Sequence, residues 1–172
     1  MTADVITIYD CAECKPLNAP LAEAILGLAD EAFSKRTHLF HGRYENLYVD
    51  AEMLPGLPAI LDLALSKAAA VLGKSKGEIK LGFWLNIMHQ GDVTTLHRHD
   101  DDDELLSAVY YVQADEASAL FRLHNNGQVS DVAPVAGRFM FFNPALPHEV
   151  TEHHSMMPRI SIGINFGPVT RD

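Results

Sequence analysis

The chain has 172 residues and a net charge of −10, from 13 Lys and Arg against 23 Asp and Glu. This acidic balance argues against a basic face for phosphate backbones or anionic lipids, so we expect neither a nucleic-acid nor a membrane partner. No apolar run approaches the roughly 18 residues of a membrane span. Residues 1–10 lack a basic region followed by an apolar stretch, which predicts a cytoplasmic protein. The length predicts a single domain over residues 1–172.

The two cysteines, Cys11 and Cys14, form one CxxC motif. No second pair completes a zinc site, and the thioredoxin-like context of a redox motif is missing. We therefore expect two ordinary thiols in a turn, with no part in the chemistry.

The first half of the chain carries two helical patterns. Apolar residues spaced three and four apart predict a helix over residues 21–33, with Asn18 as its N-cap. The same spacing predicts a second helix over residues 57–72 that ends at Gly73. Residues 43–49, between the two helices, are expected to form a strand.

From residue 79 onward, short apolar runs alternate with Gly, Pro and Asp, which is typical of consecutive strands. We expect seven of them, at residues 79–89, 105–112, 119–123, 129–132, 138–142, 149–152 and 159–166. The predicted class is α+β: a double-stranded β-helix (jelly-roll) barrel over residues 78–168, with helix-rich support in residues 1–77.

A pair of histidines offers metal ligands. His97 and His99 are two residues apart, so on a strand both imidazoles point to one face and can reach one metal ion. The acidic run at residues 100–104 supplies a carboxylate nearby, and histidine with carboxylate suits a non-haem iron site. The same run is equally compatible with a solvated acidic turn.

Two later positions add to this pattern. His148 begins a predicted strand, where a lone histidine is more often structural than a ligand. Arg159 and Ser161 share one face of a strand whose alternate positions are isoleucine. A buried arginine requires either a protein carboxylate or an anionic ligand, and its planar guanidinium matches a carboxylate. An internal ion pair or an exposed strand end would also explain Arg159.

Taken in order, several motifs resemble the iron(II)- and 2-oxoglutarate-dependent dioxygenases, most closely the prolyl-hydroxylase-like branch and small bacterial and phage members. The motifs are Gly91 to His99, Leu106 to Val112, Pro134-x-x-Gly137-Arg138-x-x-Phe141-Phe142, Pro147-His148-Glu149-Val150 and Arg159-x-Ser161. The resemblance covers about residues 79–168, roughly half of the chain.

The resemblance implies roles for individual residues. His148 would be the distal Fe(II) ligand, and Arg159 with Ser161 would bind the far carboxylate of 2-oxoglutarate. Tyr111 matches a tyrosine that also reaches this carboxylate, and Asn86 is a further residue expected to contact the cosubstrate.

The implied reaction is hydroxylation of an unactivated C–H bond with dioxygen. Trp84, Val109 and Phe141 are expected to wall the site against water. The substrate, a small molecule, amino acid or peptide, cannot be read from the sequence.

The first metal motif has two possible registers. The common form, His-x-Asp, is met by His99-x-Asp101, whereas His97-x-His99 keeps the family spacing from Gly91. We favour His97 and His99, because the other register leaves only five residues between Asp101 and Ser107. The site then holds three histidines, or Asp101 completes it.

A second class of metal protein fits part of the same stretch. His97-x-His99 followed by Glu104 resembles the first box of the cupins, but residue 140 is Met where their second box requires His. A cupin-type metalloenzyme is therefore the alternative, followed by a non-catalytic metal-binding jelly-roll module. The latter leaves Arg159 unexplained.

Overall fold

The computed structural model describes residues 6–99 and 103–170. Its helices are α1 (Lys15–Leu26) and α2 (Leu57–Leu72). Its strands are β1 (Ile6–Asp10), β2 (Lys35–Phe40), β3 (Arg43–Tyr48), β4 (Ile79–Met88), β5 (Thr94–His97), β6 (Leu106–Gln113), β7 (Phe121–Asn125), β8 (Gln128–Val132), β9 (Arg138–Phe142), β10 (His148–Val150) and β11 (Arg159–Pro168).

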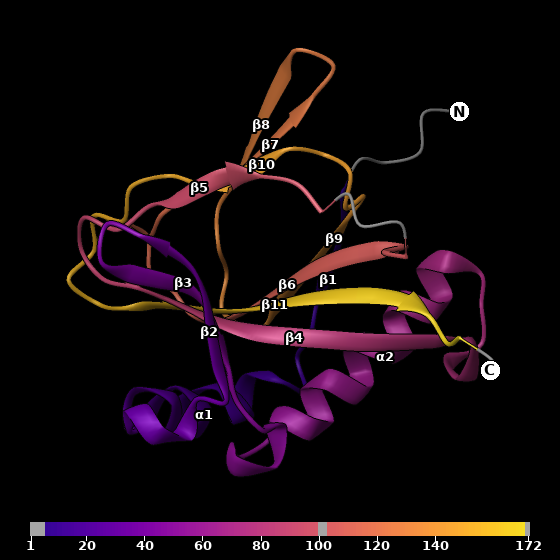
Figure 1. Cartoon of the computed structure of the whole chain (residues 1–172), viewed down its shortest axis with the longest axis horizontal. Helices are drawn as coiled ribbons and strands as arrows, with labels where there is room; N and C mark the ends of the chain where they lie inside the picture. Colours follow the sequence, from indigo (N-terminus) through magenta and orange to yellow (C-terminus); the bar gives the residue numbers. More distant parts are fainter. Residues whose placement is uncertain (1–5, 100–102, 171–172) are drawn as a thin grey trace.

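Within these described ranges the strands form two antiparallel sheets. The larger has seven strands in the order β1-β9-β6-β11-β4-β3-β2, and the smaller has four in the order β5-β10-β7-β8. The helices lie below the larger sheet and the smaller sheet lies above it (Figure 1). The predicted jelly-roll fold is confirmed, but the two sheets do not close into a continuous barrel.

The two helices differ in how well the sequence predicted them. α2 has the predicted bounds and ends at Gly73, whose φ of 63° is the left-handed conformation of a helix C-cap. α1 begins at Lys15, earlier than predicted, because Pro16 in the first turn favours helix initiation. Asn18 is thus not an N-cap; it is buried inside the helix and accepts a hydrogen bond of 2.6 Å from the Tyr110 hydroxyl.

All the predicted strands are present, with ends shifted by a few residues, and three more appear in the described chain: β1, β2 and β5. β1 and β2 are the two edges of the large sheet, where a strand needs fewer apolar side chains than one inside it. β1 and β2 bring two strands of the helix-rich first half into the same sheet as the jelly-roll strands.

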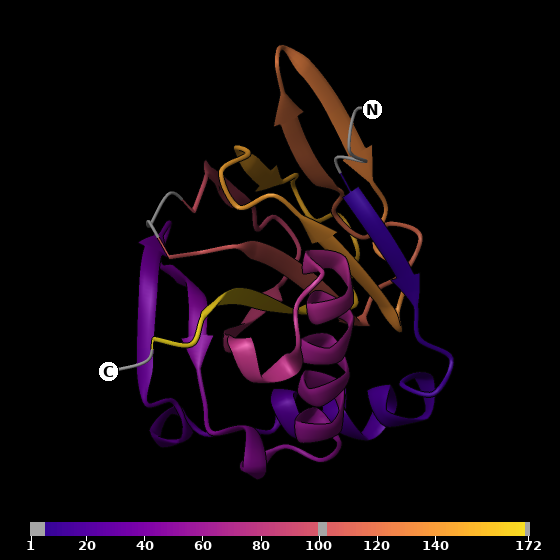
Figure 2. The same cartoon turned by 90° about the vertical axis from the view of Figure 1, so that its right-hand side faces the viewer.

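Two apolar clusters hold the layers together. One joins the helices to the large sheet and includes Ile60 of α2 and Phe141 of β9. The other lies between the two sheets and includes Phe121 of β7 and Phe142 of β9. Because successive residues of a strand point to opposite faces, a central strand such as β9 serves both clusters. Figure 2 shows α2 lying along the outer face of the large sheet.

Cys11 and Cys14 form a disulfide, which corrects the expectation of two free thiols. The turn before α1 brings their Cα atoms to 5.3 Å, a separation that a disulfide spans. None of the helices in the described residues has the length and apolar character needed to cross a membrane.

Candidate functional site

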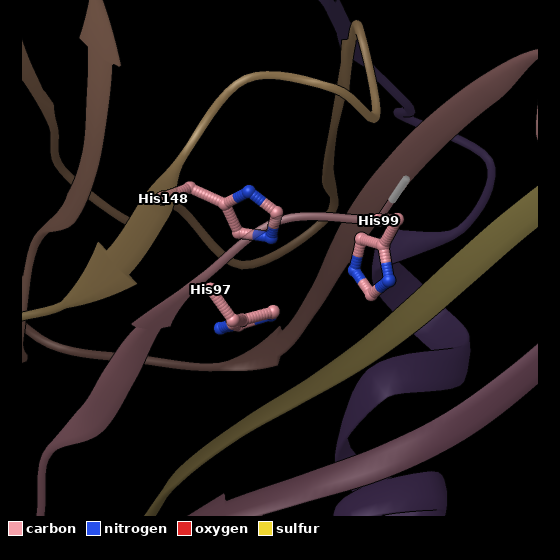
Figure 3. Close-up of side chains that lie close together, drawn as sticks. All are labelled: His97, His99 and His148. Carbon is pink, nitrogen blue, oxygen red and sulfur yellow. The ribbon is translucent and has the colours of Figure 1, made fainter. Parts of the chain in front are cut away.

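Three imidazoles converge between the sheets. His97 ends β5, His148 begins β10, and the antiparallel pairing of these strands places the two residues opposite one another. Their ring centroids are 4.3 Å apart, and the His99 ring lies 5.2 Å from each. The three rings face one another (Figure 3), and one ligand atom from each lies within 4.8 Å of the others. One metal ion could therefore bind all three.

Two of these rings have a defined tautomer. Nδ1 of His97 lies 2.7 Å from the Thr95 carbonyl, and Nδ1 of His148 lies 2.8 Å from the Leu146 carbonyl. A carbonyl oxygen can only accept, so each Nδ1 carries the hydrogen. The lone pair of Nε2 is then free for a metal, as in histidine ligands whose other nitrogen donates to the protein.

His148 is also held in its neutral form. Its side chain is almost fully buried, and burial together with the neighbouring His97 lowers its pKa to about 3. A neutral imidazole is the form that binds a metal, so His148 needs no deprotonation at neutral pH.

His99 lies just beyond the end of β5. Its backbone N–H donates to the Pro144 carbonyl at 2.9 Å, and its ring lies 5.7 Å from that of Trp84. Glu104, which a cupin-type site would use as a ligand, is 3.8 Å from Nδ1 of His99 and is not part of the described cluster. Asp101, the carboxylate of the alternative register, lies outside the described residues.

Arg159, on β11, lies across the same cavity and is 1% exposed. Its Nη1 donates to Ser161 Oγ at 3.2 Å and lies 3.6 Å from Met88 Sδ, and its guanidinium lies 5.2 Å from the centre of the Tyr111 ring. Burial lowers the pKa of Arg159, but an arginine starts so high that it stays charged. Within the described chain no carboxylate lies within ion-pair distance of Arg159 (residues 6–99 and 103–170).

The strand register brings the other predicted cosubstrate residues to Arg159. Ser161 pairs with Asn86 on β4 and with Tyr111 on β6, so the three stand in one row across the sheet. Among the residues that the structure describes, three buried polar atoms around Arg159 have no hydrogen-bond partner: Nε of Arg159, the Tyr111 hydroxyl and Oδ1 of Asn86. Burial also raises the pKa of Tyr111, which keeps its hydroxyl protonated as a donor. Buried polar groups normally have partners, so the two donors, Arg159 Nε and the Tyr111 hydroxyl, fit an anionic ligand, whereas the acceptor Asn86 Oδ1 fits a hydrogen-bond donor.

One cavity unites the imidazoles with this row. Its walls include His97, His99, His148, Arg159, Ser161, Asn86, Trp84, Val109 and Phe142. Phe141, which we expected in the wall, points instead to the helix layer, and Phe142 takes its place because strand residues alternate. Tyr111 contributes by its contact with Arg159 rather than by lining the cavity.

Sequence reasoning missed two cavity residues on β11. Gly163 and Asn165 follow Arg159 and Ser161 at every second position, so extending the same alternation would have found them. A Cβ at Gly163 would lie 2.3 Å from Cε2 of Trp84, so this glycine lets the indole lie flat against the strand.

Solved structures share this fold. A Pseudomonas putida prolyl-4-hydroxylase is 19% identical, with 95% of this chain and 92% of that chain covered at a TM-score of 0.75. A Trichoplax adhaerens prolyl hydroxylase, in complex with a peptide fragment of the hypoxia inducible factor oxygen degradation domain, is 14% identical. The match covers 96% of this chain and 84% of that chain, with a TM-score of 0.73. EvdO2 from Micromonospora carbonacea var. aurantiaca, in complex with 2-oxoglutarate, is 14% identical. The match covers 97% of this chain and 88% of that chain, with a TM-score of 0.65.

A search of the curated proteins gives no significant match. The family description that matches, over residues 83–167 and thus about half of the chain, is that of the 2OG-Fe(II) oxygenase superfamily. The matched stretch contains the three histidines and Arg159. The chain therefore belongs to the 2OG-Fe(II) oxygenase superfamily and is an oxygenase that uses Fe(II) and 2-oxoglutarate.

Proposed function

We propose that this oxygenase hydroxylates an unactivated C–H bond of an amino-acid, peptide or small-molecule substrate. The observation that carries the proposal is Arg159: a fully buried guanidinium without a described carboxylate partner, in the same cavity as three convergent imidazoles. An unpaired buried charge is costly, and a carboxylate ligand would offset that cost.

The ligand set we propose for Fe(II) is His97, His99 and His148. Imidazole nitrogens suit iron, and two of the three rings already present a free Nε2. Asp101 remains a candidate additional ligand, in the register His99-x-Asp101, because the structure does not describe it.

For the cosubstrate, Arg159 would bind the far carboxylate of 2-oxoglutarate through two guanidinium N–H groups, and Ser161 holds that guanidinium in place. The Tyr111 hydroxyl is a further donor. Asn86 offers its free Oδ1, which accepts hydrogen bonds, so we expect it to face an N–H, a hydroxyl or a water rather than a carboxylate oxygen.

When bound, iron and 2-oxoglutarate supply the oxidising chemistry with dioxygen, and the protein supplies binding, orientation and exclusion of water. Trp84, Val109 and Phe142 form the apolar part of the cavity wall and keep water from the reacting centre. Two of the structural neighbours are prolyl hydroxylases by name, so peptides containing proline are the first substrates to test. The cytoplasmic location stays a prediction from the sequence.

The test is an anaerobic titration of metal-free protein with Fe(II) and then 2-oxoglutarate, followed by visible absorption. We expect a weak charge-transfer band, which Arg159→Ala and His148→Ala weaken or abolish, and succinate formation once air is admitted. Asp131→Asn, which breaks a salt bridge to Arg122 on the β7–β8 hairpin, is the control and should keep the band. Metal binding without band or succinate would contradict 2-oxoglutarate use, and a folded protein that binds no metal would contradict the proposal as a whole.

A further inference from the structure

β5, which carries His97, is an edge strand of the small sheet and pairs with β10 alone in the described chain. Its other side is held by a side chain of the large sheet. Glu45 of β3 is 3% exposed, and its carboxylate accepts hydrogen bonds from the Thr95 backbone N–H at 2.8 Å and from the Thr95 hydroxyl at 3.1 Å. The Glu45 carboxylate thus accepts the Thr95 N–H hydrogen bond that a neighbouring strand would otherwise accept.

The buried charge of Glu45 is compensated by Arg43, two residues away on the same strand. Nη2 of Arg43 lies 3.9 Å from the Glu45 carboxylate and donates to the Val93 carbonyl at 2.6 Å, and Nε lies 3.6 Å from Asp92. Both side chains therefore reach from β3 to residues 92–95, the segment that leads into the first metal motif. These partners stabilise the buried carboxylate, which would otherwise lose its hydration without compensation.

Thr95 connects this contact to the metal centre. Its carbonyl is the group that accepts the Nδ1–H of His97 at 2.7 Å and so orients that imidazole. The backbone carbonyl of Glu45 also accepts a hydrogen bond of 3.0 Å from Asn86, on the cosubstrate side of the cavity. Glu45 therefore bonds to the metal side of the cavity through its carboxylate and to the cosubstrate side through its backbone carbonyl. Glu45 itself does not line the cavity.

We propose that Glu45 is a positioning residue of the metal centre: by fixing Thr95 it holds His97 in the tautomer and orientation that bind the metal. This inference rests on the proposed metal site. Removing a group that is hydrogen-bonded directly to a ligand, as the Thr95 carbonyl is to His97, typically weakens metal binding by about 10- to 100-fold. Glu45 acts one contact further out, through Thr95, so its removal should have an effect at the lower end of this range.

The first experiment uses the metal-free protein and long-range ¹H–¹⁵N correlation spectra of its histidine rings at one pH. In the wild type, His97 and His148 should both show the Nδ1–H tautomer. In Glu45→Ala, His97 should change to a mixture of tautomers, while His148, whose partner is Leu146, should keep its own. His148 thus serves as an internal control, because a general loss of structure would change the tautomer of His148 as well.

The second experiment measures Co(II) affinity by equilibrium dialysis and by the visible absorption of the bound ion. Glu45→Ala should bind Co(II) about 10-fold more weakly than the wild type. Glu45→Gln should lose less Co(II) affinity, since its carboxamide oxygen can still accept a hydrogen bond from the Thr95 N–H. This variant replaces Glu45→Ala in the experiment if the alanine variant does not fold. Ile60→Ala creates a cavity in the helix layer, far from the metal motif. This variant controls for reduced stability and should keep the Co(II) affinity of the wild type.

An unchanged His97 tautomer together with unchanged Co(II) affinity in both Glu45 variants would overturn the inference and leave the proposed metal site intact. A wild-type protein that binds neither Co(II) nor Fe(II) would overturn the proposed site and, with it, the role of Glu45.

Discussion

The two walls of the cavity are built differently. On the cosubstrate side, β11 pairs with β4 in an unbroken register from Arg159 opposite Met88 to Pro168 opposite Ile79. It pairs with β6 on its other edge, with a register shift between Ile160 and Ser161. On the metal side, β10 and β5 share two residue pairs, with a register shift between them. Backbone pairing thus fixes Arg159 and, through β7, also His148, whereas His97 on the edge strand β5 depends more on side-chain bonds such as those of Glu45. We therefore expect the proposed anion-binding wall to be preorganised and the proposed metal-binding wall, at His97, to be more dependent on its ligand.

The largest expected effect concerns the preorganised wall. Arg159→Met should weaken 2-oxoglutarate binding by about 2–5 kcal/mol, the usual cost of losing one partner of a buried charge pair. The same change should not destabilise the ligand-free protein, because it removes a buried charge without a described partner; a gain of about 1 kcal/mol is reasonable. Isothermal titration calorimetry and urea unfolding measure the two quantities. Unchanged binding together with marked destabilisation would mean that Arg159 is structural.

On the metal side, the register of the first motif can be decided by two substitutions. His97→Ala should weaken Co(II) binding by more than ~100-fold, since losing a ligand exceeds the loss of an outer partner. Asp101→Ala should bind like the wild type, and Asp103→Ala is the matched control in the same acidic run. If Asp101→Ala weakened binding strongly and His97→Ala did not, the pair would instead be His99-x-Asp101.

The third prediction concerns the contact between Gly163 on β11 and Trp84 on β4. Gly163→Ala places a Cβ against the indole of Trp84, which must move, at a cost of about 1–3 kcal/mol in the free energy of unfolding. Trp84 is the single tryptophan, so its fluorescence emission reports the displacement directly. Gly82→Ala is the control, because a Cβ there meets nothing within 4 Å. Equal behaviour of the two variants would show that the indole does not need Gly163.

The fourth prediction is a pH dependence of stability that arises from His148. Because its pKa falls from 6.5 to about 3 on folding, the unfolded chain binds the proton more readily. The stability that the neutral ring contributes is therefore complete above pH 6.5 and is lost as the pH falls towards 3, by about 1.4 kcal/mol per pH unit. Urea unfolding in EDTA between pH 7 and 5 should show this slope, and His148→Gln should flatten it. Identical slopes in both proteins would exclude His148 as the source.

Much of the fold and of the site could be predicted from local pattern. The bounds of α2 followed from spacing and from Gly73, and the alternation in β11 correctly placed Arg159 and Ser161 on one face. β1 and β2 were missed because edge strands carry weak patterns. Phe141 was assigned to the cavity instead of Phe142, since alternation groups residues by face without saying which face meets the site.

The sequence by itself determined which side chains share a face and which chemical groups the chain offers, because periodicity and residue type are local properties. The tertiary structure alone decided that His148 stands opposite His97, that Ser161 aligns with Asn86 and Tyr111, and that Glu45 supports Thr95. These relations join residues as much as 75 positions apart, for the pair Ser161 and Asn86. They depend on strand order, register and the facing of two sheets, which are properties of the assembled fold and not of any local segment.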